Sequence, residues 1–194
     1  MRERAVFFDR DDTLIANVPY LDDPKKIALA EGAAESLSRL KAAGFLLFLV
    51  SNQSGVGRGW ISREDVDAVN QAILSRLPTP LFSKIYLSFA APESDPLWDR
   101  KPSPLLLWRA SREFGVELRQ SFFVGDRIAD VLCGRNAGCR TLLLTANEDK
   151  KEDNRARRWA ERMADRVVPS LPAAADWILA CSAQEWNERG EASW

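Results

Sequence analysis

The chain has 194 residues, of which 46% are hydrophobic, enough for one domain with a full apolar core. Its 27 Lys and Arg residues nearly balance its 28 Asp and Glu residues, which gives a formal net charge of −1. No overall field therefore favours nucleic acid or an anionic membrane as a partner, and any anion binding must be local. Because no apolar run has the length of a membrane span or of a signal peptide core, we expect a cytoplasmic protein.

Histidine is absent, which excludes His-dependent catalytic triads and the common zinc sites. The three cysteines, Cys133, Cys139 and Cys181, show no CxxC spacing, and their odd number argues against a disulfide framework. We interpret them as reduced thiols of the core. Chemistry in this protein must therefore use carboxylates, Lys, Arg, hydroxyl groups and the backbone.

The first predicted element is a short apolar run, 5–8, that ends abruptly in acidic residues. Such a run is typical of a buried parallel strand, and an open α/β sheet binds its ligands beyond the carboxyl ends of its strands. Because side chains two apart in an extended segment share a side, we expect Asp9 and Asp11 to face one site while Arg10 faces away. Mg²⁺ would relieve the repulsion between the two carboxylates. For this stretch alone, turn residues or a helix N-cap are the alternative.

Strands and helices alternate along the rest of the chain. Apolar runs predict further strands at 45–50, 83–89, 122–124 and 140–144, and an edge strand at 165–168. Helical spacing predicts helices at 32–43, 62–77, 101–114 and 171–181. A further helix is predicted between the strands 122–124 and 140–144, ending at 137. Ser62 and Asp65 resemble a capping box at the start of the second helix. The irregular segment 15–31 predicts a lid or specificity loop, and the charged segment 147–162 predicts a surface loop and short helix.

This alternation predicts an α/β fold, a three-layer doubly wound parallel sheet of the Rossmann-like kind with right-handed crossovers. We expect a single domain over 1–181, followed by a polar C-terminal tail over 182–194.

Four polar clusters each follow a predicted strand. In chain order they are 9–13, 51–59, the segment around Lys101, and 125–130. Each has a structural alternative when taken singly: Asp126 as a helix N-cap, Lys101 as a solvated loop charge, and the glycines of the second cluster as a tight turn. Their shared position after strand ends favours one common site.

The chain resembles the haloacid dehalogenase superfamily of phosphatases in four motifs. They are Asp9-Arg10-Asp11-Asp12-Thr13, Ser51 after the second strand, Lys101 before its helix, and Gly125-Asp126 followed by Asp130. The resemblance extends from Ala5 to Leu179. Within the superfamily, 51–59 and Arg100-Lys101-Pro102 resemble subfamily IIIA, the subgroup of heptose bisphosphate and histidinol-phosphate phosphatases. That subgroup has no large cap domain, so the resemblance implies none here.

The resemblance implies hydrolysis through an aspartyl-phosphate, which divides a very slow reaction into two steps. Asp9 would be the nucleophile, and Asp11 would protonate the leaving oxygen and then activate water. The metal ligands implied for Mg²⁺ are Asp9, Asp11 through its backbone carbonyl, and Asp126, with Asp130 in support.

The transferred phosphoryl group needs hydrogen-bond donors, for which we expect Ser51, Lys101 and loop backbone N–H groups. Lys101 would also screen Asp9 from Asp126. Arg58 and Arg100 are either surface charges or the pair that binds a second phosphate. The expected catalytic residues are Asp9, Asp11, Ser51 and Lys101. The expected substrate-binding residues are Ser51, Asn52, Gln53, Arg58, Arg100 and Lys101.

Two departures from the family pattern bear on function. Asp12 stands where the family usually has Gly, which alters the turn after Asp11 and adds a negative charge near the metal. The loop 88–99 contains neither Cys nor His where this subgroup usually carries a zinc cluster, so no zinc site is expected. We interpret Trp60 and Trp98 as packing residues rather than platforms for a sugar.

The resemblance thus implies a Mg²⁺-dependent phosphomonoester hydrolase for a small phosphorylated metabolite, with a heptose bisphosphate first and histidinol phosphate second. A polynucleotide 3′-phosphatase is the third alternative, and the balanced charge argues against it because nucleic-acid binding calls for a basic cluster. The non-enzymatic alternative is a sugar-phosphate-binding protein on a decayed phosphatase fold, for which Asp12 is the sequence hint. We expect a monomer with no nucleic-acid or membrane partner.

Overall fold

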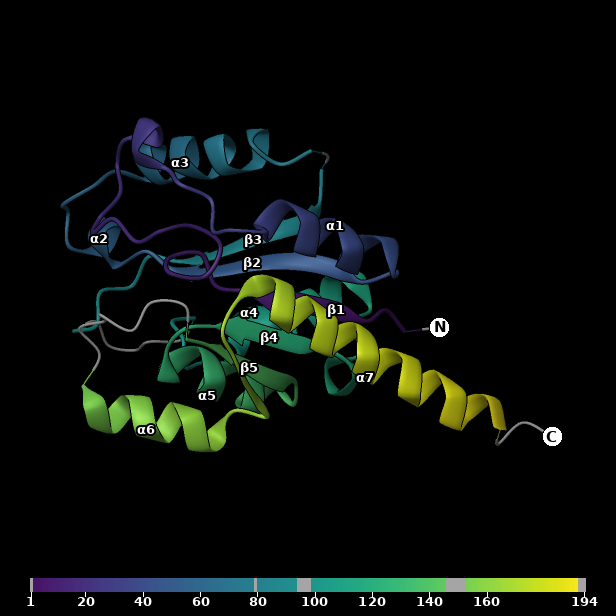
Figure 1. Ribbon diagram of the computed structural model, residues 1–194. Helices are drawn as coiled ribbons and strands as arrows, with labels where there is room; N and C mark the ends of the chain where they lie inside the picture. The colour runs from purple at the N-terminus through teal and green to yellow at the C-terminus, as the bar shows by residue number, and fades with distance from the viewer. Residues whose placement is uncertain (1, 79, 94–98, 146–152, 192–194) are drawn as a thin grey trace.

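The computed structural model describes residues 2–78, 80–93, 99–145 and 153–191, with side chains described up to residue 182. Across these residues, six parallel strands form one sheet in the order β3-β2-β1-β4-β5-β6 (Figure 1). The strands are β1 (Ala5–Phe8), β2 (Leu46–Asn52), β3 (Phe82–Ser88), β4 (Phe122–Gly125), β5 (Arg140–Leu144) and β6 (Arg166–Val168). Every strand predicted from an apolar run is confirmed, which establishes the predicted doubly wound α/β fold.

Helices connect the strands. They are α1 (Ala33–Ala42), α2 (Ser54–Gly57), α3 (Arg63–Ser75), α4 (Leu105–Phe114), α5 (Ile128–Ala137), α6 (Asn154–Met163) and α7 (Leu171–Glu191), with 3-10 turns η1 (Pro24–Lys26) and η2 (Leu118–Gln120). The capping box of Ser62 and Asp65 at the start of α3 is confirmed. Two differences stand out: α2 is a short helix within the predicted loop 51–59, and α7 continues past the predicted end at Cys181 to Glu191.

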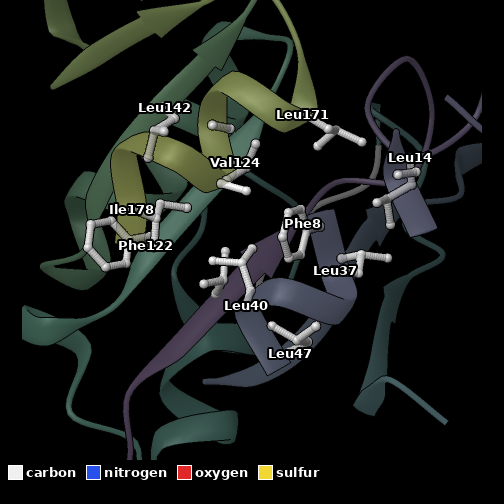
Figure 2. Packing of buried hydrophobic residues seen from close by; sticks show 14 of the residues in the cluster. Phe8, Leu14, Leu37, Leu40, Leu47, Phe122, Val124, Leu142, Leu171 and Ile178 are labelled. Atoms are coloured by element: carbon white, nitrogen blue, oxygen red, sulfur yellow. The ribbon is translucent and has the colours of Figure 1, made fainter. Parts of the chain in front are cut away.

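Apolar side chains cover both faces of the sheet, which makes three layers. On one face, strand residues pack against α1 and α7 (Figure 2). The labelled members of this cluster are Phe8, Leu14, Leu37, Leu40, Leu47, Phe122, Val124, Leu142, Leu171 and Ile178. On the other face, Phe7, Phe48 and Phe123 pack against apolar residues of α4 and α5. The strands are therefore buried on both sides, as their unbroken apolar runs predict.

The chain changes direction across the sheet between β1 and β4. From β1 it builds outward through β2 to β3, and then it returns to place β4 on the other side of β1. Asp9 follows β1 and Asp126 follows β4, so these two acids flank the position where the strand order reverses. This is the position at which doubly wound sheets bind ligands.

Among the described residues, no helix has both the length and the apolar character needed to cross a membrane. Trp98 and residues 147–152 of the charged segment lie outside the described residues, so the interpretation of Trp98 as a packing residue is not tested.

Candidate active site

The carboxylate of Asp9 is paired with the ammonium group of Lys101. Lys101 Nζ lies 2.6 Å from Asp9 Oδ1, 2.7 Å from Asp130 Oδ1 and 3.0 Å from the carbonyl oxygen of Val50. The Lys101 side chain is only 4% exposed, so it is not a solvated loop charge. Burial would lower the pKa of Lys101, but the charges of Asp130 and Asp9 outweigh burial and hold that pKa above its ordinary value. Lys101 therefore remains an ammonium ion inside the site.

Asp126, which follows β4, is not the N-cap of the next helix. Arg127 occupies the N-cap position of α5, and Asp130 Oδ2 accepts the backbone N–H groups of Arg127 at 3.0 Å and of Asp126 at 3.2 Å. Gly125 permits this turn, because a Cβ at that position would collide with the side chain of Asp130. Asp130 thus caps the helix, while the fully buried Asp126 carboxylate accepts a hydrogen bond of 3.4 Å from the Thr13 hydroxyl.

Carboxylate oxygens of Asp9, Asp126 and Asp130, the three-acid cluster, lie within 4.8 Å of one another. All three residues are buried; Asp9 and Asp130 share the ammonium group of Lys101, and the Arg127 guanidinium lies 3.6 Å from Asp126 at the rim. A hard divalent cation such as Mg²⁺ fits this set of oxygens and would relieve their mutual repulsion. Because Asp130 already accepts from Lys101 and two backbone N–H groups, Asp9 and Asp126 are the carboxylates best placed to hold the ion.

The carboxylate of Asp11 lies outside the three-acid cluster and is bound by Arg10 and Gln53. Arg10 Nη2 donates to Asp11 Oδ1 at 3.0 Å, and Gln53 Nε2 donates to Asp11 Oδ2 at 2.9 Å. Arg10 is 1% exposed and also donates to side-chain oxygens of Asn70 and Gln53. The prediction that Arg10 faces away is therefore wrong. The strand ends at Phe8, so the alternation of an extended chain does not continue through Arg10.

The residues predicted for the site at the end of β2 bind other residues of the site and hold them in position. Asn52 Oδ1 accepts the backbone N–H of Lys101 at 3.0 Å, and Asn52 Nδ2 donates to the Lys101 carbonyl oxygen at 3.2 Å. Gln53 Nε2 also donates to the buried Ser51 hydroxyl oxygen at 2.9 Å. One network thus joins Ser51, Gln53 and Asp11, and direct contact of these side chains with substrate stays a prediction.

Asp12 adopts a left-handed backbone conformation, which favours glycine. Its φ is 61°, a value that is uncommon for a residue with a side chain but is tolerated best by Asp and Asn. The side-chain amide of Asn17 donates to Asp12 Oδ2 at 3.0 Å, and Arg127 Nη2 lies 4.0 Å from the same oxygen. The turn after Asp11 therefore forms with Asp12 in place, and Arg127 lies between Asp12 and Asp126.

Arg58 and Arg100 lie in the loops that follow β2 and β3. Arg58 ends the short helix α2, where Gly57 approaches the backbone of Phe89 so closely that a Cβ would collide with its carbonyl oxygen. Arg100 precedes Lys101 and donates to the carbonyl oxygen of Ala90 at 3.0 Å. Burial and, secondly, the positive charge of Arg58 lower the pKa of Arg100.

Trp60, predicted to be a packing residue, is 57% exposed. It makes an edge contact with the Tyr20 ring at 4.5 Å between centroids, and the Arg58 guanidinium lies over its ring at 4.8 Å. Trp60 therefore packs at the surface of the site rather than in the core.

The contacts of two arginines in the site are not predicted by the strand, helix or motif patterns of the sequence. Arg157 of α6 donates to the carbonyl oxygens of Asp126 at 3.2 Å and of Leu144 at 3.4 Å, and so holds the carboxyl ends of β4 and β5. Arg10 is the other, with its ion pair to Asp11. The contacts of these two arginines could be found only from the fold, because no fixed spacing in the sequence relates an arginine to its partners.

The fold and the site define a hydrolase of the haloacid dehalogenase type. The HAD-hydrolase-like family model matches residues 99–174, which include Lys101, Asp126 and Asp130. The protein is 31% identical over 163 residues to the D-glycero-D-manno-heptose-1,7-bisphosphate 7-phosphatase of Chlorobaculum tepidum, covering 76% of this chain and 81% of that protein. It is 30% identical over 190 residues to the enzyme of the same name from Thermosynechococcus vestitus, covering 92% and 96%.

The chain therefore belongs to the haloacid dehalogenase superfamily and, within it, to the phosphatase family of these relatives. Its fold is also that of the D,D-heptose 1,7-bisphosphate phosphatase from B. bronchiseptica, solved with magnesium and phosphate. The TM-score is 0.77 at 23% identity, over 91% of this chain and 98% of that one. The prediction of a phosphatase is thus confirmed.

Proposed function

We propose that this phosphatase is Mg²⁺-dependent and hydrolyses a heptose 1,7-bisphosphate through an aspartyl-phosphate on Asp9. Two relatives support this substrate, because both are named as heptose-1,7-bisphosphate 7-phosphatases. The structural observation that carries the proposal is the buried Asp9 carboxylate, held by Lys101 within the three-acid cluster at the reversal of strand order.

In the first step, an Asp9 oxygen bonds to phosphorus while the bond between phosphorus and the sugar oxygen breaks. Lys101 Nζ, 2.6 Å from Asp9 Oδ1, fixes the orientation of this carboxylate, and among the described residues Oδ2 of Asp9 has no hydrogen-bond donor. Lys101 and the Ser51 hydroxyl would also stabilise charge on the phosphoryl oxygens. Asp9 and Asp126 would hold Mg²⁺, which when bound neutralises phosphate charge and lets a carboxylate approach an anion.

Asp11 serves both steps as acid and base. It gives a proton to the departing sugar oxygen, and it then takes a proton from the water whose oxygen bonds to phosphorus as the Asp9–phosphorus bond breaks. Inorganic phosphate is released and Asp9 is regenerated. Arg10 and Gln53 hold the Asp11 carboxylate in place for both steps.

The second phosphate of the sugar would bind to Arg58 and Arg100. Both residues follow strand ends at the catalytic edge, and guanidinium groups bind phosphate bidentately. Arg100 is the residue directly before Lys101, which links this part of the site to the catalytic ammonium group.

Release of inorganic phosphate from heptose 1,7-bisphosphate, histidinol phosphate and a 3′-phosphorylated oligonucleotide, each with Mg²⁺ and with chelator, tests this proposal. We expect metal-dependent turnover with the bisphosphate preferred, and no turnover by the D9N variant. Turnover that is insensitive to chelator, or a clear preference for either other substrate, would contradict it.

A further inference from the structure

One guanidinium group joins three loops at the catalytic edge of the sheet. Arg58, at the end of α2, donates through Nη1 to the Tyr20 hydroxyl at 3.1 Å, and its guanidinium lies over the Trp60 ring at 4.8 Å. Its Nη2 lies 2.6 Å from Glu93 Oε1. Tyr20, Trp60 and Glu93 follow β1, β2 and β3 respectively, and with Arg58 they make up the Arg58 cluster.

The partners of Arg58 differ in how firmly they are held. The Arg58 side chain is 25% exposed, whereas that of Glu93 is 69% exposed. Tyr20 is fixed by its contact with the Trp60 ring and is held at φ 51°, a conformation that a bulky residue adopts only where its surroundings impose it. An exposed ion pair in water is weak, so Glu93 is the partner that can leave.

Charge in this region favours a further anion. The positive charge of Arg58 acts on Arg100, and the Glu93 carboxylate lies 2.6 Å from Arg58 Nη2. The pKa of Glu93 lies below its ordinary value because of its own backbone N–H and, after that, its hydrogen bond from Arg58 and the charges of Arg58 and Arg100. Two cations thus share one carboxylate, and a phosphate dianion would neutralise them better.

We propose that Glu93 occupies the position of the second phosphate of the substrate on Arg58, and that the substrate must displace it to bind. Glu93 is then a specificity-determining residue that competes with the anion. Weakly anionic substrates do not displace it, whereas a bisphosphate does, and Tyr20 and Trp60 keep Arg58 in position during the exchange. This inference rests on the proposed function for the identity of the substrate.

Steady-state kinetics of E93Q against wild type tests the proposal, with heptose 1,7-bisphosphate and with heptose 7-phosphate, which lacks the second phosphate. Removal of an exposed competing carboxylate should lower the KM for the bisphosphate by up to about fivefold. The KM for the monophosphate should stay as it is. In the R58Q background, the E93Q change should no longer lower the KM for the bisphosphate, because the effect acts through Arg58.

The E117Q variant is the matched control, since Glu117 is also paired with an arginine, Arg2, at 2.7 Å, at the amino-terminal edge of the sheet. An unchanged KM for the bisphosphate in E93Q would overturn the proposal. An equal gain in the R58Q background, or an equal gain for the monophosphate, would also overturn it, because the effect would then be a general change of charge.

A second readout separates this inference from the proposed function. Both sugar phosphates are tested as inhibitors of p-nitrophenyl phosphate hydrolysis, so that neither needs to be a substrate. E93Q should lower the inhibition constant of the bisphosphate and leave that of the monophosphate unchanged. If the bisphosphate inhibits in this manner without being hydrolysed, the proposed substrate fails while the role of Glu93 stands. Equal inhibition of E93Q and wild type overturns the role of Glu93.

Discussion

The side chain of Asn52 is bound to the backbone of Lys101 through two hydrogen bonds, one to its N–H at 3.0 Å and one to its carbonyl oxygen at 3.2 Å. Asn52 ends β2, whereas Lys101 lies in the loop before α4. This contact fixes the main chain from which the catalytic ammonium group extends. The position of Lys101 Nζ beside Asp9 therefore depends on an amide side chain that does not itself contact Asp9.

Replacement of Asn52 by Ala should lower kcat by roughly ten- to a hundredfold, because a small misplacement of a catalytic group has an effect of this size. Phosphate release under saturating Mg²⁺ measures it. The matched control is N136A, since Asn136 donates one hydrogen bond of 3.2 Å to the carbonyl oxygen of the neighbouring Pro102. Equal activity of the two variants would show that Asn52 does not position Lys101.

The K101M variant removes the buried ammonium group and leaves Asp9 and Asp130 without it. Breaking a buried ion pair in this manner lowers the free energy of unfolding by about 3–5 kcal/mol. Urea unfolding in the presence of chelator measures this loss, and added Mg²⁺ should recover part of it. Because the pKa of Lys101 is raised, the stabilisation by its charge is complete below the ordinary lysine pKa and is lost only as the pH rises above it.

Lys84 provides the comparison for Lys101. It pairs with Glu113 at 2.6 Å, but both side chains are largely exposed, so K84M should change stability little. Equal losses in K84M and K101M would contradict the assignment of Lys101 as a buried, charged group.

Asp12 places a negative charge beside Arg127, which in turn lies 3.6 Å from Asp126. In D12N, Arg127 loses the carboxylate of Asp12 and pairs more strongly with Asp126, in competition with Mg²⁺. The Mg²⁺ concentration for half-maximal activity should therefore rise about three- to tenfold. Asn tolerates the left-handed conformation, so the fold is kept. D22N, which alters an exposed acid of the same loop, is the control, and an unchanged requirement for Mg²⁺ in D12N would contradict this role.

The capping box of α3 should make stability depend on pH in acid. The Ser62 hydroxyl and, secondly, the Ser62 backbone N–H lower the pKa of Asp65 below 3.8. A lowered carboxyl pKa stabilises the fold above the ordinary value, and this stabilisation is lost as the pH falls through the folded-state pKa. The difference in unfolding free energy between wild type and D65A should therefore be present at pH 7 and shrink below pH 3.8. A difference that does not change with pH would exclude the charge as its cause.

Local sequence signals were sufficient for most of the fold. Unbroken apolar runs predicted the strands, and the predicted ends of two helices at 114 and 137 are followed by Gly115 and Gly138, whose φ values are 69° and 90°. The gathering of Asp9, Asp126 and Lys101 was also predictable, because parallel strands place the residues that follow them at one edge. The C-terminal end of α7 was not predictable, because the polar residues after Cys181 carry no apolar stripe and yet continue the helix.

The contacts within the site could not be predicted in the same manner. Alternation along a strand applies only while the chain is extended, and β1 ends before Arg10 turns toward Asp11. The sequence contains no sign that Asn52 binds the backbone of Lys101, 49 residues away. Such contacts depend on how the loops fold over the sheet edge, which local propensity does not determine.

The most direct test of the account is acid quenching during turnover of a sugar phosphate labelled in the phosphate to be removed, followed by mapping of the label on the protein. With Mg²⁺ present, wild type should carry the label on the peptide that contains Asp9, in acid-stable and alkali-labile form, whereas D9N should carry none and release no phosphate. Turnover without a labelled protein, or turnover by D9N, would contradict the assignment of Asp9 as the nucleophile.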